Sequence, residues 1–196
     1  MGKDYSRILV TGGAGFIGSH LVDRLLSAGY EVAVIDNLST GRADNIAHHK
    51  NRKGFYFIKG DIRDFNLVKE TMKDIDAVFH EAALSSVALS IENPTLTNDV
   101  NVGGTLNLLK ASLDCGLKRF ILASSASVYG ETRPLKKERA QSQDPSRPTQ
   151  SPNSLQKTML ESIIIHMDLK RFAYAILMCT ALGKETALIA ASQQFL

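Results

Sequence analysis

The sequence predicts an α/β fold built on a parallel sheet. Three observations carry this prediction: apolar runs of strand length alternate with segments of helical periodicity, a glycine-rich turn follows the first run, and an acidic residue closes the second. Strands separated by helices pair in parallel through right-handed crossovers, so this order predicts a doubly wound sheet of Rossmann type. Ligands of such sheets bind at the carboxyl ends of the strands.

Five strands and four helices can be placed along the chain. We expect strands at 8–10, 31–35, 55–58, 77–80 and 120–123. The first helix follows the glycine-rich turn, and the second runs from a capping residue, Asp64, to about Met72. A long helix opens at Pro94 and ends at Gly116, and Leu106, Leu109, Lys110 and Leu113 repeat at helical spacing within it. A polar loop over 133–152 precedes a further helix that begins near Asn153.

The glycine-rich turn has the spacing G-x-G-x-x-G from Gly13 to Gly18. Glycines remove the Cβ atoms that would keep the backbone away from a pyrophosphate, and a helix N-terminus offers N–H groups and partial positive charge. Between a strand and a helix, this spacing indicates dinucleotide binding. The alternative is a glycine-rich turn that binds nothing.

Asp36, at the end of the second strand, is placed to choose the dinucleotide. Its carboxylate can accept hydrogen bonds from a ribose 2′-OH and would repel a 2′-phosphate, which favours NAD over NADP. The nearby Arg42 keeps NADP open as the alternative.

Bulk properties indicate one cytoplasmic domain. The chain has 196 residues, 44% of them hydrophobic, which is enough for one core. A net charge of +3 argues against nucleic acid or a membrane surface as partner. Two cysteines, Cys115 and Cys179, form no spaced framework and suggest reduced thiols. The longest apolar run, 172–179, is far shorter than a membrane span, and it could form a sixth strand.

No metal site is expected. The adjacent histidines His48 and His49 could bind a metal, but no cysteine or acidic residue stands at ligand spacing from them. We therefore expect both to be exposed to solvent.

Five short motifs together resemble one enzyme family. They are Thr-Gly-Gly-Ala-Gly-Phe-Ile-Gly at 11–18, Asp-Asn-Leu-Ser-Thr-Gly at 36–41, Gly-Asp-Ile-Arg-Asp at 60–64, Val-Phe-His-Glu-Ala-Ala at 78–83 and Ser-Ser-Ala-Ser-Val-Tyr-Gly at 124–130. Their order is similar to that of extended short-chain dehydrogenases/reductases, in particular the NAD-dependent epimerase/dehydratase family and its UDP-glucose 4-epimerases. The resemblance runs from about Arg7 to about Leu160.

The resemblance implies NAD as cofactor and a nucleotide sugar, a UDP-hexose, as substrate. Asp61 and Ile62 would flank the adenine, Ala82 and Ala83 would line the path to the nicotinamide, and Ser125 would hold the reacting hydroxyl of the sugar. The cofactor-binding residues implied in full are Gly12, Gly15, Phe16, Ile17, Gly18, Asp36, Asn37, Ser39, Thr40, Gly41, Asp61, Ile62, Ala82, Ala83, Ser124 and Lys157. Ser125 and Lys157 are the implied catalytic residues.

One catalytic position departs from the family. Where the family has Tyr-x-x-x-Lys, this chain has Asn153 and Lys157. An amide has no proton that it can lose and regain near neutral pH, so we expect little or no 4-epimerase activity through a 4-keto intermediate. A catalytically silent NAD-binding module, a gene product without a selected function and a sugar-nucleotide dehydratase are the alternatives. By the family resemblance, dehydratases place a pair of acidic residues beside the catalytic Ser or Thr. Residues 125–128 lack this pair, which disfavours dehydration.

The resemblance stops near residue 160, which divides the chain into an NAD-binding domain, 1–160, and an atypical tail, 161–196. Shifting the possible codons of 173–184 by one base permits the family segment Leu-Arg-Tyr-Phe-Asn-Val-Tyr-Gly-Pro-Arg-Gln at every consecutive position. We therefore hypothesise that the tail is read out of frame. The alternative is a divergent natural helix with Ile176, Leu177 and Ala181 on one apolar face.

Either way, the fold is expected to be truncated and to lack the C-terminal substrate domain. Exposed apolar surface would then favour self-association, for example as a homodimer.

Overall fold

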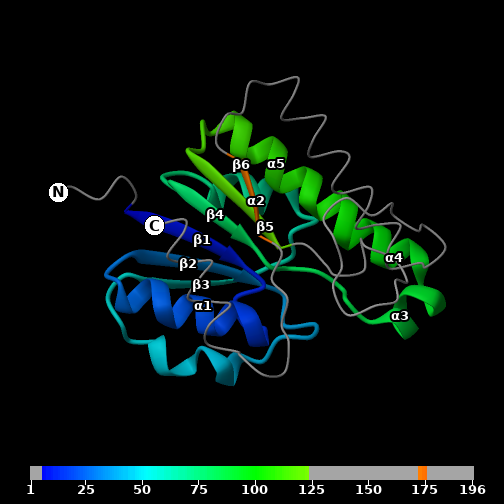
Figure 1. The fold of residues 1–196 in the computed structure, drawn as a ribbon, viewed down its shortest axis with the longest axis horizontal. Coiled ribbons are helices and arrows are strands. Elements are labelled where there is room, and N and C mark those ends of the chain that lie inside the picture. The colour runs from blue at the N-terminus through cyan, green and yellow to red at the C-terminus, as the bar shows by residue number, and fades with distance from the viewer. Residues whose placement is uncertain (1–5, 124–171, 176–196) are drawn as a thin grey trace, which may run out of the picture.

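The computed structural model describes residues 6–123 and the backbone of 172–175. One parallel sheet has the strand order β3-β2-β1-β4-β5-β6 (Figure 1). The strands are β1 Arg7–Thr11, β2 Glu31–Asp36, β3 Phe55–Lys59, β4 Ala77–His80, β5 Arg119–Ala123 and β6 Phe172–Ala175. The predicted doubly wound sheet and its five strands are confirmed. A sixth strand is confirmed over 172–175, and 176–179 lie outside the described residues.

Helices cover both faces of the sheet (Figure 1). They are α1 Phe16–Ser27, α2 Phe65–Thr71, α3 Val87–Glu92, α4 Pro94–Asn98 and α5 Thr105–Asp114, with a π-helical segment η3 at Asp99–Gly104 and 3-10 turns η1 at Ala43–Asn45 and η2 at Ala47–His49. Alternate residues of β1 enter different cores, because strand side chains point to opposite faces. Ile8 and Val10 pack with α1, and Leu9 packs with α2 and α5. Within the described residues, no helix is long and apolar enough to cross a bilayer.

Local signals set the ends of the first two helices. Asp64 caps α2 as predicted, since its carboxylate accepts hydrogen bonds from the backbone N–H groups of Asn66 and Leu67 at 3.0 and 3.1 Å. At the N-terminus of α1, Gly15 offers no side-chain cap, and the first turn contains no acidic residue. Neither the N-cap residue nor the first turn of α1 thus supplies a carboxylate to the N-terminal N–H groups of this helix.

The long helix predicted from Pro94 is present but is divided into α4, η3 and α5. The predicted apolar stripe is partly wrong, because Leu106 is exposed and Leu108 is fully buried beside Leu109. The reason is that the buried face of α5 includes two hydroxyls that the pattern treats as polar. Thr105 and Ser112 donate to the backbone carbonyls one turn earlier, at 2.7 Å each, so both can be buried.

Candidate functional site

A cavity of about 730 Å³ lies at the carboxyl edge of the sheet, at the ends of β1 to β4. All of the cofactor-binding residues predicted within the described part of the chain line it: Gly12, Gly15, Phe16, Ile17, Gly18, Asp36, Asn37, Ser39, Thr40, Gly41, Asp61, Ile62, Ala82 and Ala83. Its size suits a small-molecule or cofactor pocket. The predicted Ser124, Ser125 and Lys157 lie outside the described residues, as does Asn153.

The glycine turn forms one wall of this cavity through its backbone alone. Gly12 has a φ of +71°, and a Cβ there would lie 2.7 Å from the backbone nitrogen of Ala82. At Gly18 a Cβ would collide with the carbonyl of Gly12 and lie 2.8 Å from the Cα of Gly13. The turn can therefore be made only without side chains at these positions. Together with the uncapped N-terminus of α1, it forms a cradle that suits a pyrophosphate.

Asp36 ties this cradle to the next loop. Its Oδ2 accepts a hydrogen bond from the backbone N–H of Ala14 at 2.9 Å, and its Oδ1 accepts one from Leu38 at 2.8 Å. A Cβ at Gly41 would lie 3.0 Å from Oδ2, so glycine lets that loop approach the carboxylate. The sequence motif did not indicate this tethering role. Each carboxylate oxygen has a second lone pair with which it can accept a further hydroxyl.

A second carboxylate, Asp61, lines the cavity and is held by a bidentate contact from Arg63. Arg63 Nε lies 3.0 Å from Oδ1 and Nη2 lies 2.8 Å from Oδ2, and Asn37 Nδ2 donates to Oδ2 at 2.9 Å. The hydrogen bonds from Arg63 hold the pKa of Asp61 well below its usual range, so the carboxylate is ionised near neutral pH. Arg63 also lines the cavity and was missed from the sequence, although its two-residue spacing from Asp61 is visible there.

Arg42 was the reason why NADP remained an alternative cofactor in the sequence analysis. It is not among the residues lining the cavity. Its side chain is 76% exposed, and its Nη2 lies 3.6 Å from Asp44 Oδ2. Within the described residues, the strand-end carboxylate Asp36 therefore faces the cavity without that guanidinium.

A buried hydrogen-bond network positions the loop that carries Ala82 and Ala83. His80 Nδ1 lies 2.7 Å from Thr11 Oγ1, and its Nε2 lies 2.8 Å from Thr105 Oγ1. Because Thr105 donates to the carbonyl of Asn101, His80 Nε2 must donate and Nδ1 must accept. Burial lowers the pKa of His80 to about 4, in agreement with this neutral tautomer.

The same network reaches the loop after β4 through an amide side chain. Asn101 Oδ1 accepts from the N–H of Leu84 at 2.8 Å, and its Nδ2 donates to the carbonyl of Leu84 at 2.9 Å. Asn101 lies in the π-helical segment η3, a type of distortion that is frequent at functional sites. The loop from 81 to 85 is thus fixed to the helical layer.

Glu81 brings an unusual carboxyl group into this loop. It lines the cavity, and its Oε1 is buried with no hydrogen-bond partner within the described residues. Burial raises the pKa of Glu81 to about 7. Sequence reasoning missed this residue and the apolar residues Leu84, Leu89, Leu96 and Val100, which also line the cavity. No sequence signal marks these apolar residues as a set, because they come from a loop and three short helical segments.

The expected solvent exposure of the histidine pair is wrong for His49. The His49 side chain is 7% exposed and the His48 side chain 56%. An acidic partner exists after all: Asp23 on α1, which is distant in sequence and is brought close by the fold.

Comparisons with known proteins show the family to which this chain belongs. Residues 8–185 match the model of the NAD dependent epimerase/dehydratase family. This match extends past residue 160, near which the resemblance seen in the sequence stops. A protein of Methanocaldococcus jannaschii named "Putative UDP-glucose 4-epimerase" is 47% identical over 126 residues, which are 63% of this chain and 40% of that protein. UDP-glucuronic acid decarboxylase 4 of Arabidopsis thaliana is 43% identical over 64% of this chain and 27% of its own length.

Solved structures show the same fold. The Thermus thermophilus UDP-glucose 4-epimerase in complex with NAD matches with a TM-score of 0.78 and 37% identity, over 86% of this chain and 53% of that one. A dTDP-glucose 4,6-dehydratase of Streptomyces venezuelae with NAD bound matches with a TM-score of 0.80 and 32% identity, over 86% of this chain and 55% of that one. This chain thus spans about half the length of these structures. The family match, the sheet and the glycine cradle agree, and the chain belongs to the NAD dependent epimerase/dehydratase family.

Proposed function

We propose that this chain binds NAD in the cavity at the carboxyl edge of the sheet, as the dinucleotide-binding part of a nucleotide-sugar epimerase or dehydratase. The observation that carries the proposal is the convergence of the predicted cofactor residues on one cavity. NAD supplies a nicotinamide that can accept a hydride from a sugar carbon. The chain would hold the pyrophosphate with Gly12, Gly15 and Gly18 at the start of α1.

The remaining roles follow the positions of the strand ends. Asp36 would accept hydrogen bonds from the adenosine ribose while it holds the glycine turn in place. Asp61 and Ile62 would flank the adenine, and Ala82 and Ala83 would lie along the nicotinamide. The fixed negative charge of Asp36 would repel a 2′-phosphate, so NAD should be preferred to NADP.

The substrate class that we propose is a UDP-sugar. The relatives of this chain include a "Putative UDP-glucose 4-epimerase" and several UDP-glucuronic acid decarboxylases, whose names share a UDP-sugar. Among the reactions of such relatives we propose UDP-hexose 4-epimerisation through a 4-keto intermediate, with Ser125 holding the sugar hydroxyl and Lys157 the ribose. The motifs quoted from the sequence support this choice.

We further propose that this activity is impaired. Asn153 stands where the family has tyrosine, and its amide cannot carry the proton of the sugar hydroxyl. This residue also favours the second candidate function, a catalytically silent NAD-binding module. Ordinary turnover of UDP-glucose by the purified protein would contradict the impairment.

The out-of-frame tail is a separate proposal. Sequencing the DNA across codons 150–196 tests it directly. A frame that encodes Leu-Arg-Tyr-Phe-Asn-Val-Tyr-Gly-Pro-Arg-Gln in place of residues 174–184 is the expected result, and a confirmed native frame for the present residues would overturn it.

NAD binding is tested by thermal shift and calorimetry with the purified chain. We expect a saturable rise in melting temperature with NAD and a smaller rise with NADP at equal concentration, because a ligand stabilises the folded state that binds it. The absence of a melting-temperature shift and of a calorimetric signal with both nucleotides would overturn the proposal.

A further inference from the structure

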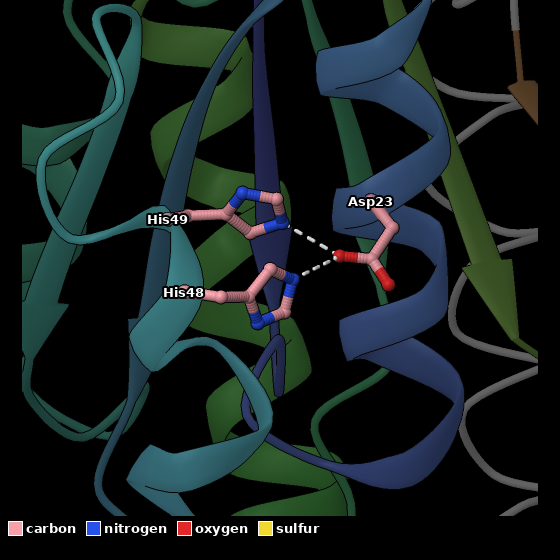
Figure 2. Close-up of side chains that lie close together, drawn as sticks. All are labelled: Asp23, His48 and His49. Atoms are coloured by element: carbon pink, nitrogen blue, oxygen red, sulfur yellow. Dashed lines mark hydrogen bonds and ion pairs between the residues drawn. The ribbon is translucent and has the colours of Figure 1, made fainter.

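Three side chains that commonly ligate metals meet on the α1 side of the sheet, and Figure 2 shows them facing one another. Asp23 lies on α1, whereas His48 and His49 lie on the 3-10 turn η2. His48 Nε2 lies 2.9 Å and His49 Nε2 2.6 Å from the same carboxylate oxygen, Asp23 Oδ1. The three ligand atoms lie within 4.8 Å of one another.

The turn that carries the histidines is anchored on α1. Ile46, directly before it, is 4% exposed and belongs to the core beside α1. Arg52 Nη2 donates to the last-turn carbonyl of Leu26 at 2.6 Å. The ring of His49 packs against that of Phe55, and the two ring centroids lie 5.5 Å apart. One ligand is therefore fixed in the core, before any ion arrives.

The opposite side of the cluster is open to solvent. The side chains of His48 and Asp23 are 56% and 41% exposed, in contrast to 7% for His49. An ion could enter from this side, and a water molecule could complete its coordination. The other carboxylate oxygen, Oδ2, faces His20, whose Nδ1 lies 3.9 Å away, so Oδ1 is left to the two histidines.

Two histidine rings converge on one carboxylate oxygen, Asp23 Oδ1, although a single hydrogen bond would satisfy one of its lone pairs. Successive residues of a 3-10 turn point about 120° apart, yet the two ring centroids lie 3.9 Å apart and both rings face one oxygen. Two imidazoles and one carboxylate, with one open position, form a known ligand set for zinc and related ions. We propose that Asp23, His48 and His49 form a binding site for one divalent transition-metal ion of the zinc type.

The geometry suits this ion after a small adjustment. Ligand atoms at 2.0–2.1 Å from a tetrahedral zinc lie about 3.3 Å apart. The present separations of 2.6 and 2.9 Å are shorter, because N–H protons lie between the atoms. For Nε2 of each neutral imidazole to bind the ion, its single proton would move to Nδ1. The exposed His48 and Asp23 can rotate outward. His49 need hardly move.

The site is distinct from the cofactor cavity. None of its three residues lines that cavity. It joins the middle of α1 to the end of the loop that begins at Asp36, so a bound ion would act as a clamp between two segments whose other ends form the cavity wall. Its test does not depend on NAD binding.

The experiment is a Zn²⁺ titration of the untagged chain in competition with a chromogenic chelator, followed by Co²⁺ absorbance. We expect about one equivalent of Zn²⁺ per chain and a Co²⁺ spectrum of tetrahedral type. Asp23→Asn and His48→Ala should each weaken Zn²⁺ binding at least tenfold. His48 is exposed, so its variant should fold even if a change at His49 does not.

Asp44→Asn is the matched control. Like Asp23→Asn, it removes one negative charge, here from η1 in the loop that carries the histidines. The Asp44 side chain is 84% exposed, pairs with Arg42 and is not one of the three residues of the cluster. Zn²⁺ affinity should change less than twofold in this variant. Stoichiometric binding that survives Asp23→Asn and His48→Ala, or that is lost on Cys115→Ser, would overturn the proposal, as would the absence of saturable binding.

Discussion

The buried carboxyl group of Glu81 predicts an unusual dependence of stability on pH. Burial raises its pKa in the folded chain to about 7, from an ordinary value of 4.5. Folding therefore favours the protonated form. As the pH rises from about 4.5 to 7, the unfolded chain loses this proton and the folded chain retains it, so the free energy of unfolding falls.

The magnitude follows from the two pKa values. A difference of one unit corresponds to about 1.4 kcal/mol, so the wild type should lose about 1 kcal/mol through Glu81 by pH 5 and about 3 kcal/mol by pH 8. Glu81→Gln has nearly the same shape and no charge to bury. It should be more stable than the wild type by an amount that grows by about 2 kcal/mol between pH 5 and pH 8.

Urea unfolding at pH 5, 6, 7 and 8 measures this difference, with Glu92→Gln as the control. Glu92 is an exposed glutamate on α3, so its neutralisation should change stability by less than about 0.5 kcal/mol at each pH. A difference between Glu81→Gln and wild type that stays constant across the series would refute the reasoning. So would a difference that shrinks as the pH rises.

Three further predictions concern the cradle and the supports of the sheet. Gly18→Ala should abolish NAD binding and cost about 1–3 kcal/mol in urea unfolding, because its Cβ meets the backbone of Gly12 and Gly13; Gly103→Ala, with nothing within 4 Å, should instead stabilise by about 0.5–1 kcal/mol, and equal effects of the two would contradict this account. Asn101→Ala should cost about 2–4 kcal/mol and weaken NAD binding, since both backbone groups of Leu84 lose their partner; unchanged affinity would show that the loop after β4 does not depend on this clamp. Burial opposes ionisation of Asp76, but hydrogen bonds from Lys118, Ser6 and Arg7 outweigh it and depress its pKa, so its stabilising effect is present above the ordinary pKa and lost as the pH falls below it; Asp76→Asn should lower the melting temperature at pH 7, and a deficit that persists unchanged in acid would speak against this sign.

Much of the fold could be predicted because its signals are local. The strands β1, β2 and β4 are almost fully buried, so their apolar runs stand out in the sequence. The glycines and Asp36 sit at strand ends, which the parallel topology alone brings to one edge. That is why the residues of the candidate cavity could be predicted from the sequence.

What the sequence did not predict depends on contacts between distant residues. The approach of Asp23 to His49 requires η2 to pack on α1, which no spacing in the sequence indicates. No local pattern in the sequence indicates that Glu81 is buried, and the exposure of Leu106 follows from buried hydroxyls on α5. In each case the tertiary packing, and not the local sequence, decides whether the side chain is buried or exposed and which residue it contacts.

The central claim is that the carboxyl edge of this sheet binds NAD through Asp36 and the glycine cradle. Isothermal titration calorimetry of NAD into the wild-type chain and Asp36→Ala tests it most directly, with circular dichroism to show that the variant is folded. The account predicts saturable binding at one site in the wild type and at least a tenfold loss in the variant. Equal affinity in both, or no binding by the folded wild type, would contradict it.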